Sequence, residues 1–576
     1  MFQKEKTLET KHCKNCNISF DITDKDLEFY EKVSPVFNGQ KYLIPTPSLC
    51  PECRRQRRLS WRNETKLYKR NCNFTGKSVV SIYSPDKDFI TYNQDDWWSD
   101  KYNPFDYGID FDFYRPFFDQ YLDLRKKVPR ITILNGFSEN ADYGNHSYYN
   151  KNSYFVCSCG YVEDCYYCTT VANSKRCLDC LKVSNSQICY ECIDSKDCYN
   201  CFYVKDSYNC SDLFLCEDCQ GTKYCIGCKG LKNKSYYILN RQVSKNEYAQ
   251  IFDMIKNDME FRNKLFLDYN KLKNSFPSKN LNIINSQNIT NSDKIENSDQ
   301  IYNCFECINS KNIKYCTEMM FLEAENNYDN DLWGENSSYI YEVHCTGNSK
   351  NILFSNIVWG GYNIMYCDNC LGTPNNCFGC IGLKGNEQYC ILNKQYTKEE
   401  YEKLVPKIIE HMMKTGEWGE FFPSSISPFG YNETVAVEYF PLTKEDAKEK
   451  GFNWSDYESP LPKVDKIIPA NMLPENIADI PDDILNWAIE SELELTEGFS
   501  PLYRIIKQEL EFYRKHNLPI PKRHPDQRHL DRMKLRNTRK LYDRKCDKCG
   551  VDMKTTYSPE RPEIIYCESC YEKEVY

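Results

Sequence analysis

The sequence has few histidines, no long hydrophobic run and no excess of positive charge. Its 576 residues include only 7 His, and 83 acidic residues outnumber 74 Lys and Arg, for a net charge of -9. No run of 18 apolar residues occurs, so we expect no membrane helix and no membrane partner. The opening "MFQKEKTLETKHCKNC" reaches a CxxC pair without an apolar segment, so we expect no signal peptide. A cytoplasmic protein is therefore expected, with cysteines that stay reduced unless they bind metal.

Familiar catalytic motifs are also missing. The chain contains no HExxH, no glycine-rich phosphate loop, and no recurring Ser/His/Asp or Cys/His arrangement. We therefore expect a protein that is not an enzyme. The sequence is rich instead in cysteine and tyrosine, with 33 Cys and 45 Tyr.

Most of the cysteines follow a period of three residues. From Ser153 to Leu231 every third residue is small or aliphatic, and a twelve-residue period places turn formers at Asn173, Asn185 and Asp197. The pattern predicts a narrow β-solenoid with twelve-residue coils, in which Cys, Ser, Val and Thr fill the interior as small side chains. Metal binding by stacked CxxC pairs and disulfides between neighbouring thiols stay open beside the packing interpretation, which a reducing cytosol favours.

The same three-residue rule returns from Ile283 to Leu322 and again from Ile340 to Thr373. Both cysteine-rich stretches end alike, in "CIGCKGLKNKSYYILN" (225–240) and "CFGCIGLKGNEQYCILN" (377–393), and then become amphipathic near 244–272 and 397–414. The sequence predicts the following order: a first β-solenoid (147–240), a helical cap (241–278), a second β-solenoid (281–395), a helical cap (396–415) and an acidic Pro-rich connector (416–494). The connector should contain one short helix from Asp482 to Glu494. The polar insertion 323–339 is expected to be a surface loop, and a binding loop is left open.

The two ends of the chain are diverged copies of one module, 1–110 and 495–576. "DLEFY" (26–30) returns as "ELEFY" (509–513), and "YSPDK" (83–87) as "YSPER" (557–561). Each copy carries one set of four cysteines with the spacing of a structural Zn²⁺ site. The predicted ligands are Cys13, Cys16, Cys50 and Cys53 in the first copy, and Cys546, Cys549, Cys567 and Cys570 in the second. We expect two Zn²⁺ per chain.

Each set is lost in the other copy. The first set is replaced by Thr496, Phe499, His524 and Gln527 in the C-terminal module, and the second by Cys72, Thr75, Asn93 and Asp96 in the N-terminal module. Neither replacement closes a tetrahedron of good zinc ligands.

The first zinc set also carries a family resemblance. In "CPEC" (50–53) a proline stands just inside a helix start, as in the second half of a treble clef. "CKNCNISFDITDKDLEFYEK" and "PSLCPECRRQRR" resemble the zinc-binding treble-clef domain family of uncharacterised bacterial proteins. The two-ended layout is similar to long cysteine-rich proteins of uncultured bacteria with small genomes. The resemblance implies a treble-clef or zinc-ribbon fold for the end modules and zinc binding by the first set. The C-terminal copy departs from the family pattern because it has lost that set, so zinc there rests on Cys546 to Cys570 alone. The resemblance implies no activity.

Both copies keep a row of cations at i, i+4 spacing, although they exchanged their zinc ligands. The rows are Arg54, Arg58, Arg62, Lys66 and Arg70, and Arg528, Arg532, Arg536, Lys540 and Arg544. On a helix such a row follows one side. Guanidinium groups in this arrangement suit phosphate contact with RNA or DNA, with Trp61 and Tyr68 as candidate stacking groups. A solvated helix face, or pairing with acids of the connector and the solenoid edges, is the alternative.

Two functional hypotheses follow for a mainly β protein with some α structure. In the first, the basic zinc modules contact nucleic acid or a ribonucleoprotein and the solenoids set their spacing, which requires the cation rows to be exposed. In the second, the chain is a protein–protein interaction scaffold or an acidic nucleic-acid mimic. Acids such as Glu191, Asp206, Glu217 and Asp218 then face the partner, while the cation rows are buried in internal ion pairs. The sequence leaves a dimer open.

Overall fold

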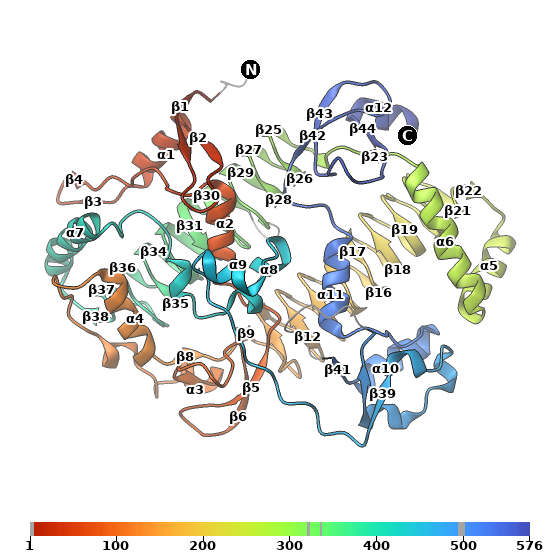
Figure 1. Ribbon diagram of the computed structural model, residues 1–576, viewed down its shortest axis with the longest axis horizontal. Helices are drawn as coiled ribbons and strands as arrows, with labels where there is room; N and C mark the ends of the chain where they lie inside the picture. Colours follow the sequence, from red (N-terminus) through yellow and green to blue (C-terminus); the bar gives the residue numbers. More distant parts are fainter. Residues whose placement is uncertain (1–4, 320–322, 335–336, 493–500, 576) are drawn as a thin grey trace. The chain divides into compact units, whose positions relative to one another are not determined.

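A computed structural model describes residues 5–319, 323–334, 337–492 and 501–575 (Figure 1). The protein is mainly β with some helices, and it divides into two compact units. One unit joins Met1–Thr132 to Leu281–Ser455, and the other joins Ile133–Asn280 to Asp456–Tyr576. Each end module therefore shares a unit with the cysteine-rich stretch that is farther from it in the sequence. The order of segments along the chain did not predict this exchange.

None of the helices in the described part of the chain is long and apolar enough to cross a membrane.

Parallel strands build the cysteine-rich part of the second unit. Its strands are β12 (Tyr154–Cys157), β13 (Tyr166–Thr169), β14 (Lys175–Leu178), β15 (Leu181–Ser184), β16 (Gln187–Tyr190), β17 (Ile193–Lys196), β18 (Tyr199–Lys205), β19 (Ser211–Glu217), β20 (Lys223–Ile226) and β21 (Ser235–Ile238). Paired residues lie twelve positions apart, as in Cys177 beside Cys189 and Cys189 beside Cys201. The pairings of β13, β14, β16, β18, β17 and β15 return to β13, so these six parallel strands form a closed ring.

The cysteines of this stretch pack as small buried side chains. They form one core cluster with Val156, Val171 and similar residues. The Cys168 sulfur lies 3.4 Å from the carbonyl oxygen of Tyr166 and 3.5 Å from that of Cys177, within reach of a thiol hydrogen bond. The Ser186 hydroxyl is used in the same way and donates to the Ser184 carbonyl at 2.7 Å. These contacts support the packing interpretation.

Every third backbone residue of these coils lies in the left-handed region. The expected positions Asn173, Asn185 and Asp197 have φ between 49° and 56°, but so do bulky residues such as Tyr167 and Ile188. A left-handed residue other than glycine costs about 1–2 kcal/mol, so the stacked side chains must offset this strain. Some do so by hydrogen bonds between coils: the Asn185 amide donates to Asp197 at 3.2 Å. The sequence predicted left-handed residues at the Asn and Asp positions but not at the bulky ones such as Tyr167 and Ile188.

The first unit contains the second stack of parallel strands. The strands used below are β29 (Ser310–Lys314), β30 (Ala324–Asp331), β31 (Ser338–His344), β32 (Asn348–Leu353), β34 (Gly360–Met365), β36 (Asn375–Phe378) and β37 (Gln388–Ile391). The predicted surface loop 323–339 is wrong for residues 324–331, which form β30 between β29 and β31, and for residues 338–339, which begin β31. The insertion lengthens the coil, because Ser310 pairs with Ala324 and Asn327 with Ile340. Residues 335 and 336 lie outside the described part.

The amphipathic stretches are helices, as predicted. They form α5 (Lys245–Asn257), α6 (Met259–Ser275) and α7 (Lys398–Thr415). Tyr248 of α5 and Leu265 of α6 join the buried cluster that contains Phe214 and Ile226 of the neighbouring strands. The helices therefore cover apolar side chains of the coils that would otherwise be exposed to water.

The predicted connector helix from Asp482 to Glu494 is wrong. The chain forms a short 3-10 helix, η6 (Asp482–Asn486), and then strand β40 (Trp487–Glu490). β40 lies between β39 (Lys466–Pro469) and β41 (Leu502–Tyr503), so strand pairing outweighs the local helical pattern. Residues 493 and 494 lie outside the described part, as do Thr496 and Phe499.

Candidate metal centres and arginine clamps

The first cysteine cluster joins a strand turn to the start of a helix. Cys13 and Cys16 lie in the turn between β1 (Thr7–His12) and β2 (Ser19–Thr23), and Cys50 and Cys53 begin α2 (Pro51–Leu59). The four sulfur atoms all lie within 4.8 Å of one another, and Cys16 and Cys50 are 3.7 Å apart. Four thiolates at about 2.3 Å from a central Zn²⁺ are about 3.8 Å apart, so the cluster has the dimensions of a tetrahedral site.

The surroundings of this cluster favour a thiolate at Cys50. The pKa of Cys50 falls to about 5, because the thiol and backbone N–H of Cys53 donate to its sulfur, although burial opposes the shift. The Asn15 amide donates to the Cys53 sulfur at 3.4 Å. The N-terminus of α2 adds a favourable dipole. Burial raises the pKa of Cys16, and the hydrogen bond to the Cys50 sulfur raises that of Cys53, so Cys50 is the ligand that releases its proton readily.

The second cluster repeats this plan in the C-terminal module. Cys546 and Cys549 lie in the turn between β42 (Tyr542–Lys545) and β43 (Asp552–Thr555), and Cys567 and Cys570 lie at the start of α12 (Glu568–Val575). The sulfur atoms of Cys549 and Cys567 are 3.8 Å apart. Burial raises the pKa of Cys546, but backbone N–H groups of Cys567, Cys549 and Lys548 outweigh it and lower this pKa to about 6. Both predicted sets of four cysteines are thus brought together and can hold a metal ion.

The arginines of the predicted cation rows are not on the surface. Arg54, Arg58 and Arg62 are 1%, 0% and 1% exposed. Their counterparts Arg528, Arg532 and Arg536 are 4%, 2% and 6% exposed. Phosphate contact requires exposed guanidinium groups, so the prediction that these six residues contact nucleic acid is corrected. Their partners are carboxylates of the parallel coils.

The first arginine clamp comprises Arg54, Arg57 and Arg58 of helix α2, together with Arg62, which lies just after the helix ends. Arg58 contacts three buried carboxylates: Asp331 at 2.7 Å, Asp329 at 3.2 Å and Glu342 at 3.3 Å. Arg54 binds Asp329 at 2.9 Å, Arg62 binds Glu318 at 2.7 Å, and Arg57 reaches Glu342 and Glu420. Arg57 lies outside the i, i+4 row, and all of these acidic partners lie more than 250 positions away, so neither could be predicted from the local sequence.

Helix α11 (Pro525–Lys534) begins the second arginine clamp, which comprises Arg528, Arg532 and Arg536. Arg532 lies 3.1 Å from both Asp179 and Glu191. Arg528 binds Asp179 and also Glu509 of α10 (Lys507–His516) at 3.3 Å. Arg536 donates to both oxygens of Asp194, at 2.8 and 3.0 Å.

Both clamps contact the same order of side chains on successive coils. The column contacted by the first clamp is Tyr315, Asp329 and Glu342, and that of the second is Tyr167, Asp179 and Glu191. Arg54 lies over the Tyr315 ring at 5.3 Å and Arg528 over the Tyr167 ring at 4.9 Å. All six column residues have positive φ, so each side chain leaves its coil from a left-handed position. The contact between the arginine clamp and the coils is therefore built alike in the two units.

Burial makes the shared carboxylates unusual. Burial and the charge of Asp179 raise the pKa of Glu191 to about 7 despite Arg532. Burial also raises the pKa of Glu342 and of Glu509. These acids hold their protons more tightly than exposed carboxylates do.

The remaining members of the cation rows, Lys66, Arg70, Lys540 and Arg544, lie outside the clamps. Arg70 donates to the carbonyl groups of Ser84 and Phe89, and Arg544 donates to those of Ser558 and Glu563. Lys66 is half-buried and Lys540 is exposed. The predicted stacking groups are also occupied: Trp61 is buried against Phe422, and Tyr68 donates to Glu433. Both helices end before the rows are complete, at Leu59 and Lys534.

The acids expected to face a partner are used inside the second unit. Glu191 binds Arg532, and Glu217 lies 2.7 Å from Lys273 and 3.2 Å from Lys205. Asp206 is 3.2 Å from Lys205, and Asp218 accepts a hydrogen bond from Tyr571 of α12. These contacts occupy the carboxylates that an acidic nucleic-acid mimic would have to display.

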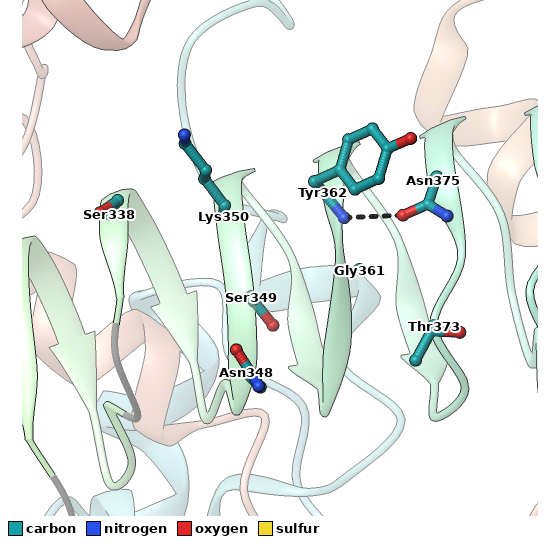
Figure 2. A pocket seen from close by; sticks show the side chains of 8 residues that line it. All are labelled: Ser338, Asn348, Ser349, Lys350, Gly361, Tyr362, Thr373 and Asn375. Atoms are coloured by element: carbon teal, nitrogen blue, oxygen red, sulfur yellow. Dashed lines mark hydrogen bonds between the residues drawn. The ribbon is translucent and has the colours of Figure 1, made fainter.

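A shallow groove on the second stack is a separate candidate site (Figure 2). Its lining is polar: Ser338, Asn348, Ser349, Lys350, Gly361, Tyr362, Thr373 and Asn375. The backbone N–H of Tyr362 donates to the Asn375 side chain at 3.2 Å. The Ser349 hydroxyl is buried and has no hydrogen-bond partner among the described residues. The groove can offer hydrogen bonds to a small polar molecule, but it contains no arrangement for acid–base or nucleophilic chemistry.

Comparison with known proteins adds no relative. No protein-family model matches the chain, and no curated protein matches its sequence. The function is therefore inferred from the two cysteine clusters and the two arginine clamps.

Proposed function

We propose that this chain is a non-enzymatic scaffold in which two structural Zn²⁺ ions hold basic modules against two stacks of parallel coils. The observation that carries the proposal is the repetition of the clamp. Arginines of both modules meet carboxylates at equivalent positions of two different stacks, with exposed fractions of 7% or less. Residues committed in this way stabilise the fold and are withdrawn from external ligands.

The proposed metal is Zn²⁺ because each cluster presents four sulfur ligands at tetrahedral spacing. Four protein ligands leave no open coordination position, which suits a structural role rather than catalysis. In the N-terminal module Cys50 and Cys53 fix the first turn of α2, directly before Arg54. In the C-terminal module Cys570 precedes Tyr571, which binds Asp218 of the coils. Each metal thus orders a helix that touches a stack.

The coils are further proposed to be narrow β-solenoids, and the end modules to have treble-clef-like folds. The twelve-residue register and the left-handed residue at every third position support the solenoid. Cysteines in a strand turn and at a helix start support the treble clef, as does the resemblance noted for residues 13–57. A cytoplasmic location fits reduced, closely packed thiols.

A protein partner is proposed in preference to nucleic acid. Phe137, Tyr149 and Tyr161 form an exposed column with ring centroids 5.0 and 4.9 Å apart. Their exposed fractions are 82%, 46% and 55%. Exposed aromatic clusters of this kind are typical of protein contact surfaces. The charges beside the column, such as Lys175 and Glu163, pair with each other at 2.7 Å and leave no basic field for phosphates.

Three measurements test the proposal. Metal analysis of the folded protein should find two Zn²⁺ per chain. In hydrogen–deuterium exchange, Cys50→Ser with Cys53→Ser should expose the amides of α2, β30 and β31, and Cys546→Ser with Cys549→Ser should instead expose those of β42, β43 and α12. RNA and duplex DNA should not bind in a salt series. Binding that weakens steeply with salt would replace the scaffold by a nucleic-acid binder.

A further inference from the structure

A third turn of the same kind as the two metal-cluster turns lies between β5 (Tyr68–Asn71) and β6 (Ser78–Ser81). The Cys72 N–H donates to the Lys77 carbonyl at 2.9 Å, and the Gly76 N–H donates to the Cys72 carbonyl at 2.8 Å. The corresponding distances at Cys546 are also 2.9 and 2.8 Å. Gly76 has φ of 70° and Gly550 has φ of 74°, so both turns require a left-handed residue at the same place. Cys72 therefore has the backbone of a metal-binding turn.

The second half of a metal site is present as well. Asn93 precedes α3 (Gln94–Trp98) as Cys567 precedes α12. The Asn93 N–H donates to the Cys72 sulfur at 3.4 Å, and the Cys567 N–H donates to the Cys546 sulfur at 3.3 Å. The strand before each helix is tied in the same way, through Asn73 to Thr91 at 2.9 Å and through Asp547 to Ile565 at 2.7 Å.

We infer that Cys72, Thr75, Asn93 and Asp96 occupy a zinc-site backbone in which hydrogen bonds and a lysine replace the metal. The Asn93 amide donates to both the Cys72 sulfur and the Asp96 carboxylate, and so joins two ligand positions. Lys101 lies 3.1 Å from Asp96 and supplies the positive charge that a cation would bring. Cys72 is 1% and Asp96 6% exposed, Asn93 is half-buried and Thr75 is exposed, so the centre lies at the surface with two of its four positions covered. Each module therefore needs only one metal.

This inference predicts that the metal can be restored without changing the fold. Thr75→Cys, Asn93→Cys and Asp96→Cys together place four sulfur ligands on the existing backbone. The zinc content of the folded chain should rise from two to three ions, about 1.5-fold. Absorption from thiolate-bound Co²⁺ should rise in the same proportion. A variant with Thr75→Ser, Asn93→Ser and Asp96→Ser changes the same positions without adding sulfur, and it should keep two ions.

Lys101 provides a second readout that does not depend on the triple variant. In the unchanged chain, Lys101→Met should increase hydrogen exchange of the β5–β6 amides several-fold and leave the zinc content at two. In the triple-cysteine background with zinc, the same substitution should have little effect, because the metal has taken over the role of the lysine. The inference is overturned if the folded triple-cysteine variant still binds two ions. It is also overturned if Lys101→Met leaves exchange unchanged in the original chain.

Discussion

Removal of one buried guanidinium should reveal how strongly a module is held on its stack. Arg58→Ala deletes a group that is fully buried and contacts three carboxylates between 2.7 and 3.3 Å away. Removing one partner of a buried ion pair typically costs about 3–5 kcal/mol, because the other charges stay buried without compensation. We expect the free energy of opening around α2 to fall by about this amount.

The second clamp supplies an internal comparison of different size. Arg532 contacts two carboxylates, and one of them, Glu191, keeps 20% of its side chain exposed. Water can partly compensate that acid after Arg532→Ala. The expected loss is about 2–3 kcal/mol, as for hydrogen bonds to charged groups. The structure thus predicts an order, with the larger effect at Arg58.

Hydrogen–deuterium exchange with mass spectrometry is the suitable assay, because a chain with two units need not unfold in one step. The amides of α2, β30 and β31 report on the first clamp, and those of α11, β14 and β16 report on the second. Lys69→Ala removes an exposed charge in the same module and should change protection by no more than about 0.5 kcal/mol. A loss below about 1 kcal/mol for Arg58→Ala would show a solvated guanidinium and refute the clamp. Equal losses of opening free energy for Arg58→Ala and Arg532→Ala would refute the dependence of clamp strength on the number of buried carboxylates.

Three other expectations concern the metals, the acids and the coil interior. A competing chelator should remove the C-terminal ion first, because Cys549 is exposed whereas Cys13 and Cys50 are buried. A Cys546→Ser variant should lack the fast phase of metal release, and one common rate of release for both ions would contradict this expectation. Glu191 keeps its proton up to about pH 7 when folded but loses it near 4.5 when unfolded, so its contribution to stability falls as pH rises from 4.5 to 7. The melting temperature of Glu191→Gln should therefore rise relative to that of the original chain as pH increases from 4.5 to 7. A difference that stays constant over this range would show that Glu191 has an ordinary pKa. Cys189→Ser should be tolerated better than Cys189→Leu, since overpacking costs about 1–3 kcal/mol; thermal melts that rank them in the opposite order would show spare room inside the coils.

Features with a local physical cause could be predicted from the sequence. The three-residue rhythm of small side chains predicted which residues form the buried core, and Cys177 and Cys189 pair there on parallel strands. Four cysteines in two CxxC pairs predicted both clusters, because zinc requires four ligands at short range. Amphipathic periods predicted α5, α6 and α7, although the connector helix failed where β40 found partners on both sides.

Features that depend on distant partners could not be predicted. The sequence pattern of Arg54, Arg58 and Arg62 is the same whether the side chains face water, phosphate or carboxylates. Its burial depends on Asp329 and Glu342, which follow more than 270 positions later. The insertion that carries Asp329 looked like a loop because it is mostly polar. Asp329 serves this interface, whereas Asn327 and Asn330 are buried in register with the core residues Ile340 and Val343. The pairing of each module with the farther stack has no counterpart in any local pattern.

A single charge difference explains how each module can distinguish two similar columns. The position of Arg57 in α2 is taken by Asp531 in α11, at the same distance from the first clamp arginine of each helix. Arg57 binds Glu342 and Glu420, whereas Asp531 turns to Arg523. If α11 docked on the Tyr315–Asp329–Glu342 column, Asp531 would take the place of Arg57 and bring a second negative charge to Glu342. Like charges at a buried contact cost several kcal/mol, so the wrong pairing is opposed while the common arginines favour docking as such. Buried ion pairs add little net stability compared with apolar contacts, so we expect the difference between Arg57 and Asp531 to act on the choice of stack more than on overall stability.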